Sequence, residues 1–145
     1  MSDMSTTDHD KSHTSKQLAL VMIVEDEIPI AEALALIVED AGYAVILATS
    51  AHTALDHLDA GARPMLIITD LMMPRMDGAD FIRAVRALLG HEAPPIILTT
   101  AGDHAIAALA QADALLYKPF SIRKVESLLH RYLASESPES PESPE

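Results

Sequence analysis

The chain has 145 residues, of which 49% are apolar, so it is long enough to bury the core of one domain. Its 22 acidic and 10 basic residues give a formal net charge of −12, which opposes direct binding to DNA or RNA. The chain has no cysteine, which excludes disulfides and thiolate metal sites, and no apolar run nears the roughly 20 residues that cross a bilayer.

Both ends of the chain have the composition of unfolded segments. Residues 1–16 are polar, contain acids and lack the apolar stretch of a secretory signal. Residues 136–145 read ESPESPESPE, with a proline at every third position. We therefore predict two disordered tails, a single domain over residues 17–135 and a cytoplasmic location.

Short apolar runs alternate with stretches of helical period along this domain. The predicted strands cover residues 18–24, 44–48, 65–69, 95–99 and 114–117. The predicted helices cover residues 28–40, 51–58, 79–89, about 103–111 and 122–133, the fourth being short. Ser50 and Ser121 are the predicted N-caps of the second and fifth helices. The strand runs are continuously apolar, which is typical of parallel strands buried on both faces.

Five successive strand–helix units predict a doubly wound α/β fold of the flavodoxin-like kind. Right-handed crossovers would place helices on both faces of a five-stranded parallel sheet with strand order 2-1-3-4-5. Ligands of such sheets bind where the winding reverses, at the carboxyl ends of the first and third strands. The position of a functional site is thus predicted before any motif is considered.

Acidic side chains follow the two strands that meet at this point. Glu25 and Asp26 come directly after the first strand, and Asp70 comes directly after the third. Their mutual repulsion in a crevice favours a bound divalent cation, and Mg²⁺ takes few carboxylates, so a phosphate would complete its oxygen ligands. The first segment alone fits a solvated acidic loop equally well, but Asp70 after a buried strand favours the metal site. We interpret Glu27 as a charge in the first turn of the helix.

Four motifs occur at the ends of predicted strands, in the order VMIVEDE, DLMMPRMDG, PPIILTTA and YKPF. Each motif alone is a weak signal, but the four together resemble the CheY-like receiver domain of bacterial response regulators, in two-component signalling. The resemblance covers about residues 18–134. It implies an Mg²⁺ site in which Asp26 is a direct ligand and Glu25 acts largely through water. Asp70 would be both ligand and phosphoacceptor, and Met72 would contribute its backbone carbonyl.

The resemblance also implies a switch region. Thr100 matches the switch hydroxyl and Lys118 the invariant lysine, whose bond to Pro119 is expected to be cis. Receivers often carry an aromatic residue three positions before this lysine, and here that position is Leu115. Tyr117 is expected on the opposite face of the strand and therefore not to substitute. The segment from Thr100 to Lys118 is shorter than the usual pattern by about one helical turn, so we expect an intact phosphorylation site with an altered read-out.

The resulting hypothesis is a stand-alone response regulator that takes a phosphoryl group onto Asp70 from a sensor histidine kinase or a histidine phosphotransfer protein. It would catalyse only its own Mg²⁺-dependent phosphorylation and dephosphorylation, and would signal to a downstream protein as a monomer or a phosphorylation-dependent dimer. A phosphorelay intermediate or phosphate sink, or a degenerate receiver that binds partners without phosphorylation, remains an alternative. A haloacid-dehalogenase-type phosphatase is disfavoured because it needs a second acid where Met72 stands.

Overall fold

The computed structural model describes residues 18–102 and 110–134. Its strands are β1 (Leu20–Val24), β2 (Ala44–Ala48), β3 (Leu66–Asp70), β4 (Ile96–Thr100) and β5 (Ala114–Tyr117). Its helices are α2 (Ile28–Asp40), α3 (Ala51–Asp59), α4 (Gly78–Leu89) and α6 (Ile122–Leu133), with the short 3₁₀ helix η1 (Gly90–Glu92). Most of the predicted fourth helix, and both predicted tails, lie outside the described residues.

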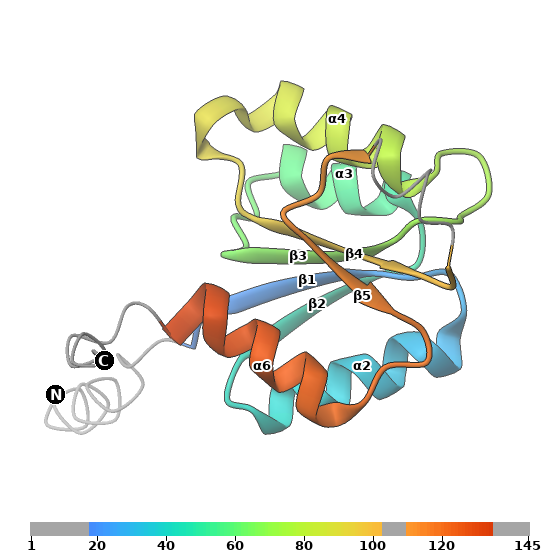
Figure 1. Cartoon of the computed structure of the whole chain (residues 1–145). Helices are drawn as coiled ribbons and strands as arrows, with labels where there is room; N and C mark the ends of the chain where they lie inside the picture. Colours follow the sequence, from blue (N-terminus) through green and yellow to red (C-terminus); the bar gives the residue numbers. More distant parts are fainter. Residues whose placement is uncertain (1–17, 103–109, 135–145) are drawn as a thin grey trace, which may run out of the picture.

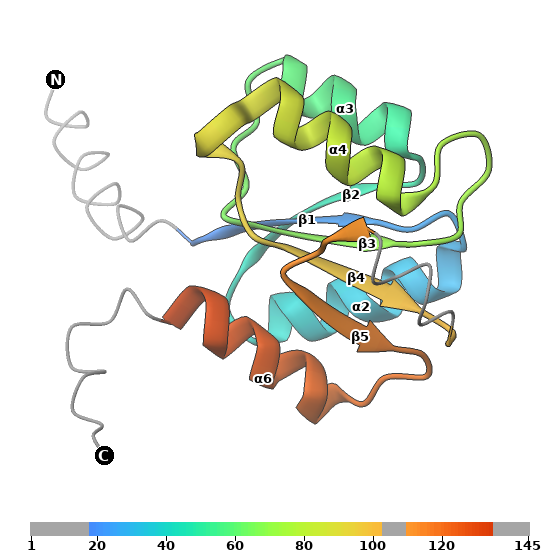
Figure 2. The same cartoon turned by 45° about the horizontal axis from the view of Figure 1, so that its top comes forward.

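The five strands form one parallel sheet in the order β2-β1-β3-β4-β5, which confirms the predicted topology. Figures 1 and 2 show α3 and α4 covering one face of the sheet and α2 and α6 covering the other. Two apolar clusters fill the layers. Met22, Ile67 and Phe81 belong to the cluster beneath α3 and α4, and Ile23 and Leu129 to the one beneath α2 and α6. The sheet is therefore buried on both faces, as its continuous apolar runs indicate.

The helix ends agree with the local sequence signals in most cases. Ser50 and Ser121 cap α3 and α6 by accepting hydrogen bonds from the backbone N–H three residues further on, as predicted. Asp77 caps α4 in the same way. Glu27 is the N-cap residue of α2, so its predicted place in the first turn is wrong: its extended backbone, with φ −89° and ψ 107°, precedes the helix.

The register of the central strands brings their carboxyl ends to one edge of the sheet. Val24 pairs with Thr69, Asp70 with Thr99, and Thr100 with Tyr117. The carboxyl ends of β1, β3, β4 and β5 therefore lie along one edge of the sheet, with β4 between β3 and β5. No helix in the described ranges combines the length and the apolar character that a membrane crossing requires.

Candidate functional site

Three carboxylates meet at the carboxyl edge of the sheet. Oxygens of Glu25, Asp26 and Asp70 all lie within 4.8 Å of one another. Asp70 ends β3, and the other two follow β1, its neighbour in the sheet. Glu25 is only 2% exposed and Asp70 only 5% exposed, so water screens their repulsion poorly. The sequence prediction that these acids share one crevice is confirmed.

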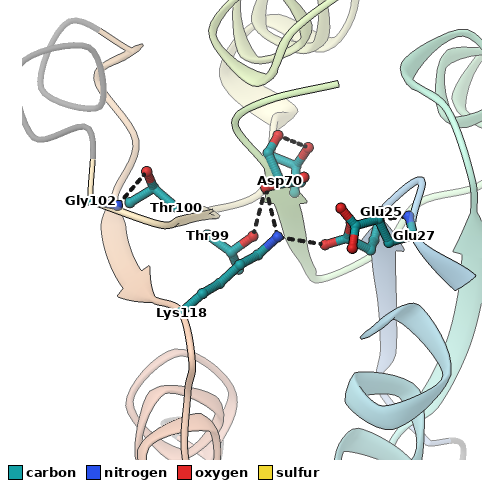
Figure 3. Close-up of polar contacts among 8 residues, drawn as sticks. Glu25, Glu27, Asp70, Thr99, Thr100, Gly102 and Lys118 are labelled. Atoms are coloured by element: carbon teal, nitrogen blue, oxygen red, sulfur yellow. Dashed lines mark hydrogen bonds and ion pairs between the residues drawn. The ribbon is translucent and has the colours of Figure 1, made fainter. Parts of the chain in front are cut away.

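Lys118 reaches the same cluster from the end of β5. Its Nζ lies 3.1 Å from Oδ1 of Asp70 and 3.2 Å from Oε1 of Glu25 (Figure 3). Its backbone N–H donates to the carbonyl of Thr100 at 2.8 Å, and its bond to Pro119 is cis, as the resemblance implied. One ammonium thus faces three carboxylates in this cluster, which leaves an excess of negative charge.

The protonation of the cluster reflects this crowding. Burial is the largest influence on Glu25 and raises its pKa above the ordinary 4.5, with the charge of Asp70 acting in the same direction. Burial alone would lower the pKa of Lys118, but its hydrogen bonds and ion pairs with Asp70 and Glu25 outweigh that effect. The pKa of Lys118 therefore lies above its ordinary 10.5. The lysine is fully charged at neutral pH.

The donor set fits a magnesium ion. Hard cations prefer oxygen ligands, and Mg²⁺ commonly takes one or two carboxylates directly and completes its shell with water and phosphate oxygens. Glu25, Asp26 and Asp70 offer such oxygens around a point of surplus negative charge. Binding a divalent cation there offsets the repulsion that Lys118 leaves uncompensated.

Two consecutive threonines at the end of β4 lie in different surroundings. Oγ1 of Thr99 is 3.4 Å from Oδ1 of Asp70, whereas Oγ1 of Thr100 accepts from the N–H of Gly102 at 3.3 Å. Figure 3 shows Thr99 beside Asp70 and Lys118, and Thr100 lying toward Gly102. Thr100 was the sequence candidate. Thr99 was missed, although the register of β3 against β4 pairs it with Asp70.

The loop after Asp70 is held close to β3 where it joins α4. The N–H of Gly78 donates to the carbonyl of Leu71 at 2.7 Å. A Cβ on Gly78 would lie 2.4 Å from the carbonyl oxygen of Asp70, so only glycine allows this approach. Met72 lies within the loop and is 60% exposed, which leaves its side chain outside the core.

The face assigned to Tyr117 on β5 was wrong. Leu115 pairs with Leu98 and Tyr117 with Thr100, and side chains two apart on a strand share a face. Leu115 packs against the cluster beneath α3 and α4, so Tyr117 lies on that face as well. The aromatic ring is 40% exposed. Tyr117 is therefore on the side of β5 where the family's aromatic is expected.

An apolar pocket lies beside the carboxylate cluster. It has a volume of about 540 Å³ and joins the first turn of α2 to the segment after β5. Its lining includes Ile30, Lys118, Pro119 and Phe120. Lys118 therefore connects this pocket to Asp70.

The sequence and the fold are similar to those of known proteins. The family model for the response regulator receiver domain matches residues 21–130. The curated relatives include Rre1 of Synechocystis sp., 32% identical over 125 residues, which is 83% of this chain and 54% of that protein. MprA of Mycobacterium sp. strain KMS is 35% identical over 127 residues, with the same two shares. The chain spans about half the length of these relatives.

Solved structures of similar proteins match 81–82% of this chain. The chemotaxis protein CheY4 of Vibrio cholerae is 31% identical with a TM-score of 0.73, over 81% of this chain and 100% of that one. The receiver domain of a histidine kinase from Syntrophus aciditrophicus is 30% identical with a TM-score of 0.75, over 82% and 92%. This chain belongs to the response regulator receiver family. Its predicted flavodoxin-like fold and its place in two-component signalling are confirmed.

Proposed function

We propose that this chain takes a phosphoryl group onto Asp70 from the phosphohistidine of a sensor histidine kinase or a histidine phosphotransfer protein. The observation that carries the proposal is the buried Asp70 carboxylate, 3.1 Å from the ammonium of Lys118 and within reach of two further carboxylates. The proposed receiver unit is residues 17–135. It would act in the cytoplasm as a monomer or a phosphorylation-dependent dimer, and would signal through contact with a downstream protein.

The proposed reaction is a displacement at phosphorus. An oxygen of Asp70 forms the new O–P bond, the N–P bond of the donor breaks, and the donor imidazole leaves with the electron pair and takes up a proton. Lys118 stabilises the negative charge on the transferring oxygens. When bound at Glu25, Asp26 and Asp70, with the carbonyl of Met72, Mg²⁺ supplies the remaining positive charge.

The proposed consequence of transfer is a local rearrangement. An aspartyl phosphate carries about two negative charges where the Asp70 carboxylate carried one, and the added charge attracts the Lys118 ammonium and a hydroxyl donor. Thr100 is the proposed donor, since it is buried at the end of β4 and already bonds the loop through Gly102. Movement of Thr100 would pull on that loop. Leu115 would replace the usual aromatic in the response.

The phosphodonor must bring its histidine against Asp70, so its surface must also cover the rim of the site. The apolar pocket beside Lys118 supports a protein donor, because apolar side chains filling it would bury surface next to the reacting atoms. Ile28 and Ile122, 45% and 59% exposed at the starts of α2 and α6, add further apolar area at this end of the molecule.

The test is incubation of the whole chain with acetyl phosphate and Mg²⁺, followed by measurement of base-labile phosphate on the intact protein. Wild type is expected to take up one phosphate and Asp70→Asn none. Asp113→Asn is the matched control, since Asp113 lies at the opposite edge of the sheet and should leave uptake unchanged. Beryllofluoride binding provides an independent readout. If wild type takes up no phosphate and binds no beryllofluoride, the chain is instead a phosphorylation-independent binding module.

A further inference from the structure

We propose that Thr99 is a positioning residue, whose hydroxyl holds the Asp70 carboxylate in the orientation from which it attacks phosphorus. The proposal rests on the proposed function of Asp70 and adds a residue to it. Its basis is the pairing of β3 with β4, which sets Thr99 directly opposite Asp70. Side chains of paired residues in a parallel sheet project from the same face, so hydroxyl and carboxylate become neighbours.

The hydroxyl of Thr99 is buried and lies against the Asp70 carboxylate. Thr99 is 2% exposed, and its Oγ1 lies 3.4 Å from Oδ1 of Asp70. A buried hydroxyl without a partner is costly, and a carboxylate oxygen can only accept. Thr99 therefore donates to Asp70. At 3.4 Å this contact is longer than the usual O–H···O hydrogen bond of about 2.5–3.0 Å, and we expect it to shorten when a phosphoryl donor is bound.

Thr99 also holds the main chain next to Asp70. Its carbonyl oxygen accepts from the N–H of Leu71 at 2.9 Å. The side chain of Thr99 thus contacts the Asp70 carboxylate, while its backbone carbonyl holds Leu71, the residue that follows Asp70. A single residue of β4 restrains both the position and the rotation of the nucleophile.

The two donors to the carboxylate converge on one of its oxygens. Nζ of Lys118 is 3.1 Å and Oγ1 of Thr99 is 3.4 Å from the same atom, Oδ1. The terminal torsion of an aspartate is broad, so a carboxylate rotates easily unless donors fix it. With Oδ1 held by both donors, Oδ2 is the oxygen presented to the phosphorus. Lys118 alone, on a flexible stem, would fix the rotation less well.

The adjacent threonine cannot take this role. Thr100 projects from the other face of β4, and its Oγ1 accepts from the N–H of Gly102. Thr99 therefore acts on the carboxylate before transfer, whereas Thr100 is proposed to respond after it. The two hydroxyls act at different stages because successive side chains of a strand point to opposite faces, so only Thr99 faces the carboxylate before transfer.

The test compares Thr99→Val, which removes the hydroxyl but keeps the shape, with Thr99→Ser, which keeps the hydroxyl. Thr69→Val is the matched control: Thr69 is also fully buried, but its hydroxyl donates to the backbone carbonyl of Asp70 at 3.2 Å. Initial rates of phosphorylation are measured across acetyl phosphate concentrations with Mg²⁺ present. Thermal unfolding shows whether Thr99→Val is folded, and if it is not, Thr99→Ala is used in its place.

Loss of positioning should lower the maximal rate of Thr99→Val about tenfold and change the half-saturating concentration by less than about twofold. Thr99→Ser should restore the rate to within about twofold of wild type, and Thr69→Val should match wild type. The proposal is overturned if Thr99→Val retains the wild-type rate, or if Thr99→Ser is as slow as Thr99→Val. Absence of phosphate on wild type itself would instead refute the proposed function of Asp70.

Discussion

The two edges of the sheet each carry an aspartate with several partners, but the surroundings differ: Asp70 is buried and Asp113 is exposed. At the far edge from Asp70, Oδ2 of Asp113 accepts from the N–H of Ile96 at 2.8 Å and from Nη2 of Arg86 at 3.3 Å. The hydroxyl of Tyr132 donates to the carbonyl of Asp113 at 3.1 Å. One residue thus connects β4, α4 and α6 at the start of β5.

The difference lies in how charge is balanced. Asp113 faces one guanidinium, and both side chains are more than a third exposed, so their charges are paired and solvated. Asp70 and two further carboxylates face one ammonium in a buried cluster. The charge of Asp113 is balanced by its own partner, and its hydrogen bonds connect neighbouring elements of the fold. The Asp70 cluster keeps an excess of negative charge, and a bound Mg²⁺ ion would offset it.

The largest expected effect is at the carboxyl edge, from Gly78→Ala. The added methyl would meet the Asp70 carbonyl oxygen at 2.4 Å and the Cα of Leu71 at 2.9 Å, both of which belong to rigid backbone. We expect a loss of about 3 kcal/mol in the free energy of unfolding, together with weakened beryllofluoride binding. Urea denaturation measures the first effect. An unchanged midpoint would mean that the loop before α4 is not held against β3.

Asp113→Ala should remove the contacts at the opposite edge of the sheet and leave the Asp70 site unchanged. The buried N–H of Ile96 loses its partner, which should cost about 2 kcal/mol, while the exposed Arg86 pair adds little. Denaturation should show this loss, and titration with Mg²⁺ should show wild-type affinity. A large drop in Mg²⁺ affinity would contradict the independence of the two edges.

Magnesium should stabilise the chain through the carboxylate cluster alone. At a concentration ten times its dissociation constant, Mg²⁺ should raise the free energy of unfolding of wild type by about 1.4 kcal/mol. Asp26→Asn should lose most of this gain, since it removes one of the three carboxylates. Thermal unfolding with and without Mg²⁺ measures the shift, with Ca²⁺-free buffers and Asp113→Asn as the control. An equal gain in Asp26→Asn would exclude Asp26 as a ligand.

The smallest expected effect is a pH dependence carried by Glu25. Because its pKa is raised on folding, the folded protein keeps a proton that the unfolded chain has already lost just above pH 4.5. Without divalent cations, this contribution should destabilise the protein as pH rises through the folded-state pKa and should be relieved as pH falls toward 4.5. The difference in unfolding free energy between wild type and Glu25→Gln, followed against pH, isolates it. A difference that does not vary with pH would contradict the raised pKa.

Much of the site could be predicted from the sequence because the ends of buried strands have a recognisable pattern. A run such as LIIT followed by Asp70 predicts both the end of a buried strand and a carboxylate at the active edge. Strand order then brought Asp70 beside Glu25 and Asp26, and the cluster is observed. The helix caps Ser50 and Ser121 were predictable because a cap depends on residues only three positions apart.

The facing of single side chains was not predictable in the same way. A shift of one residue in strand register reverses every side chain, so Thr99 and Thr100 exchange roles on a difference the local sequence does not encode. The face of Tyr117 is a different case, because the two-residue period of a strand places Leu115 and Tyr117 on one face in any register. Glu27 proved to lie one position before its helix. The facing of Thr99 toward Asp70 depends on how β3 and β4 pair.

The sequence by itself determined the order of elements, the topology of the sheet and the chemical groups at its carboxyl edge, because all of these follow from local periodicity and strand order. Only the tertiary structure decided which hydroxyl faces Asp70 and that Lys118 lies between Asp70 and Glu25. It alone revealed that Asp113 joins three elements at the opposite edge. Such contacts join residues distant in the chain, and their geometry is fixed only when the packed sheet sets its register.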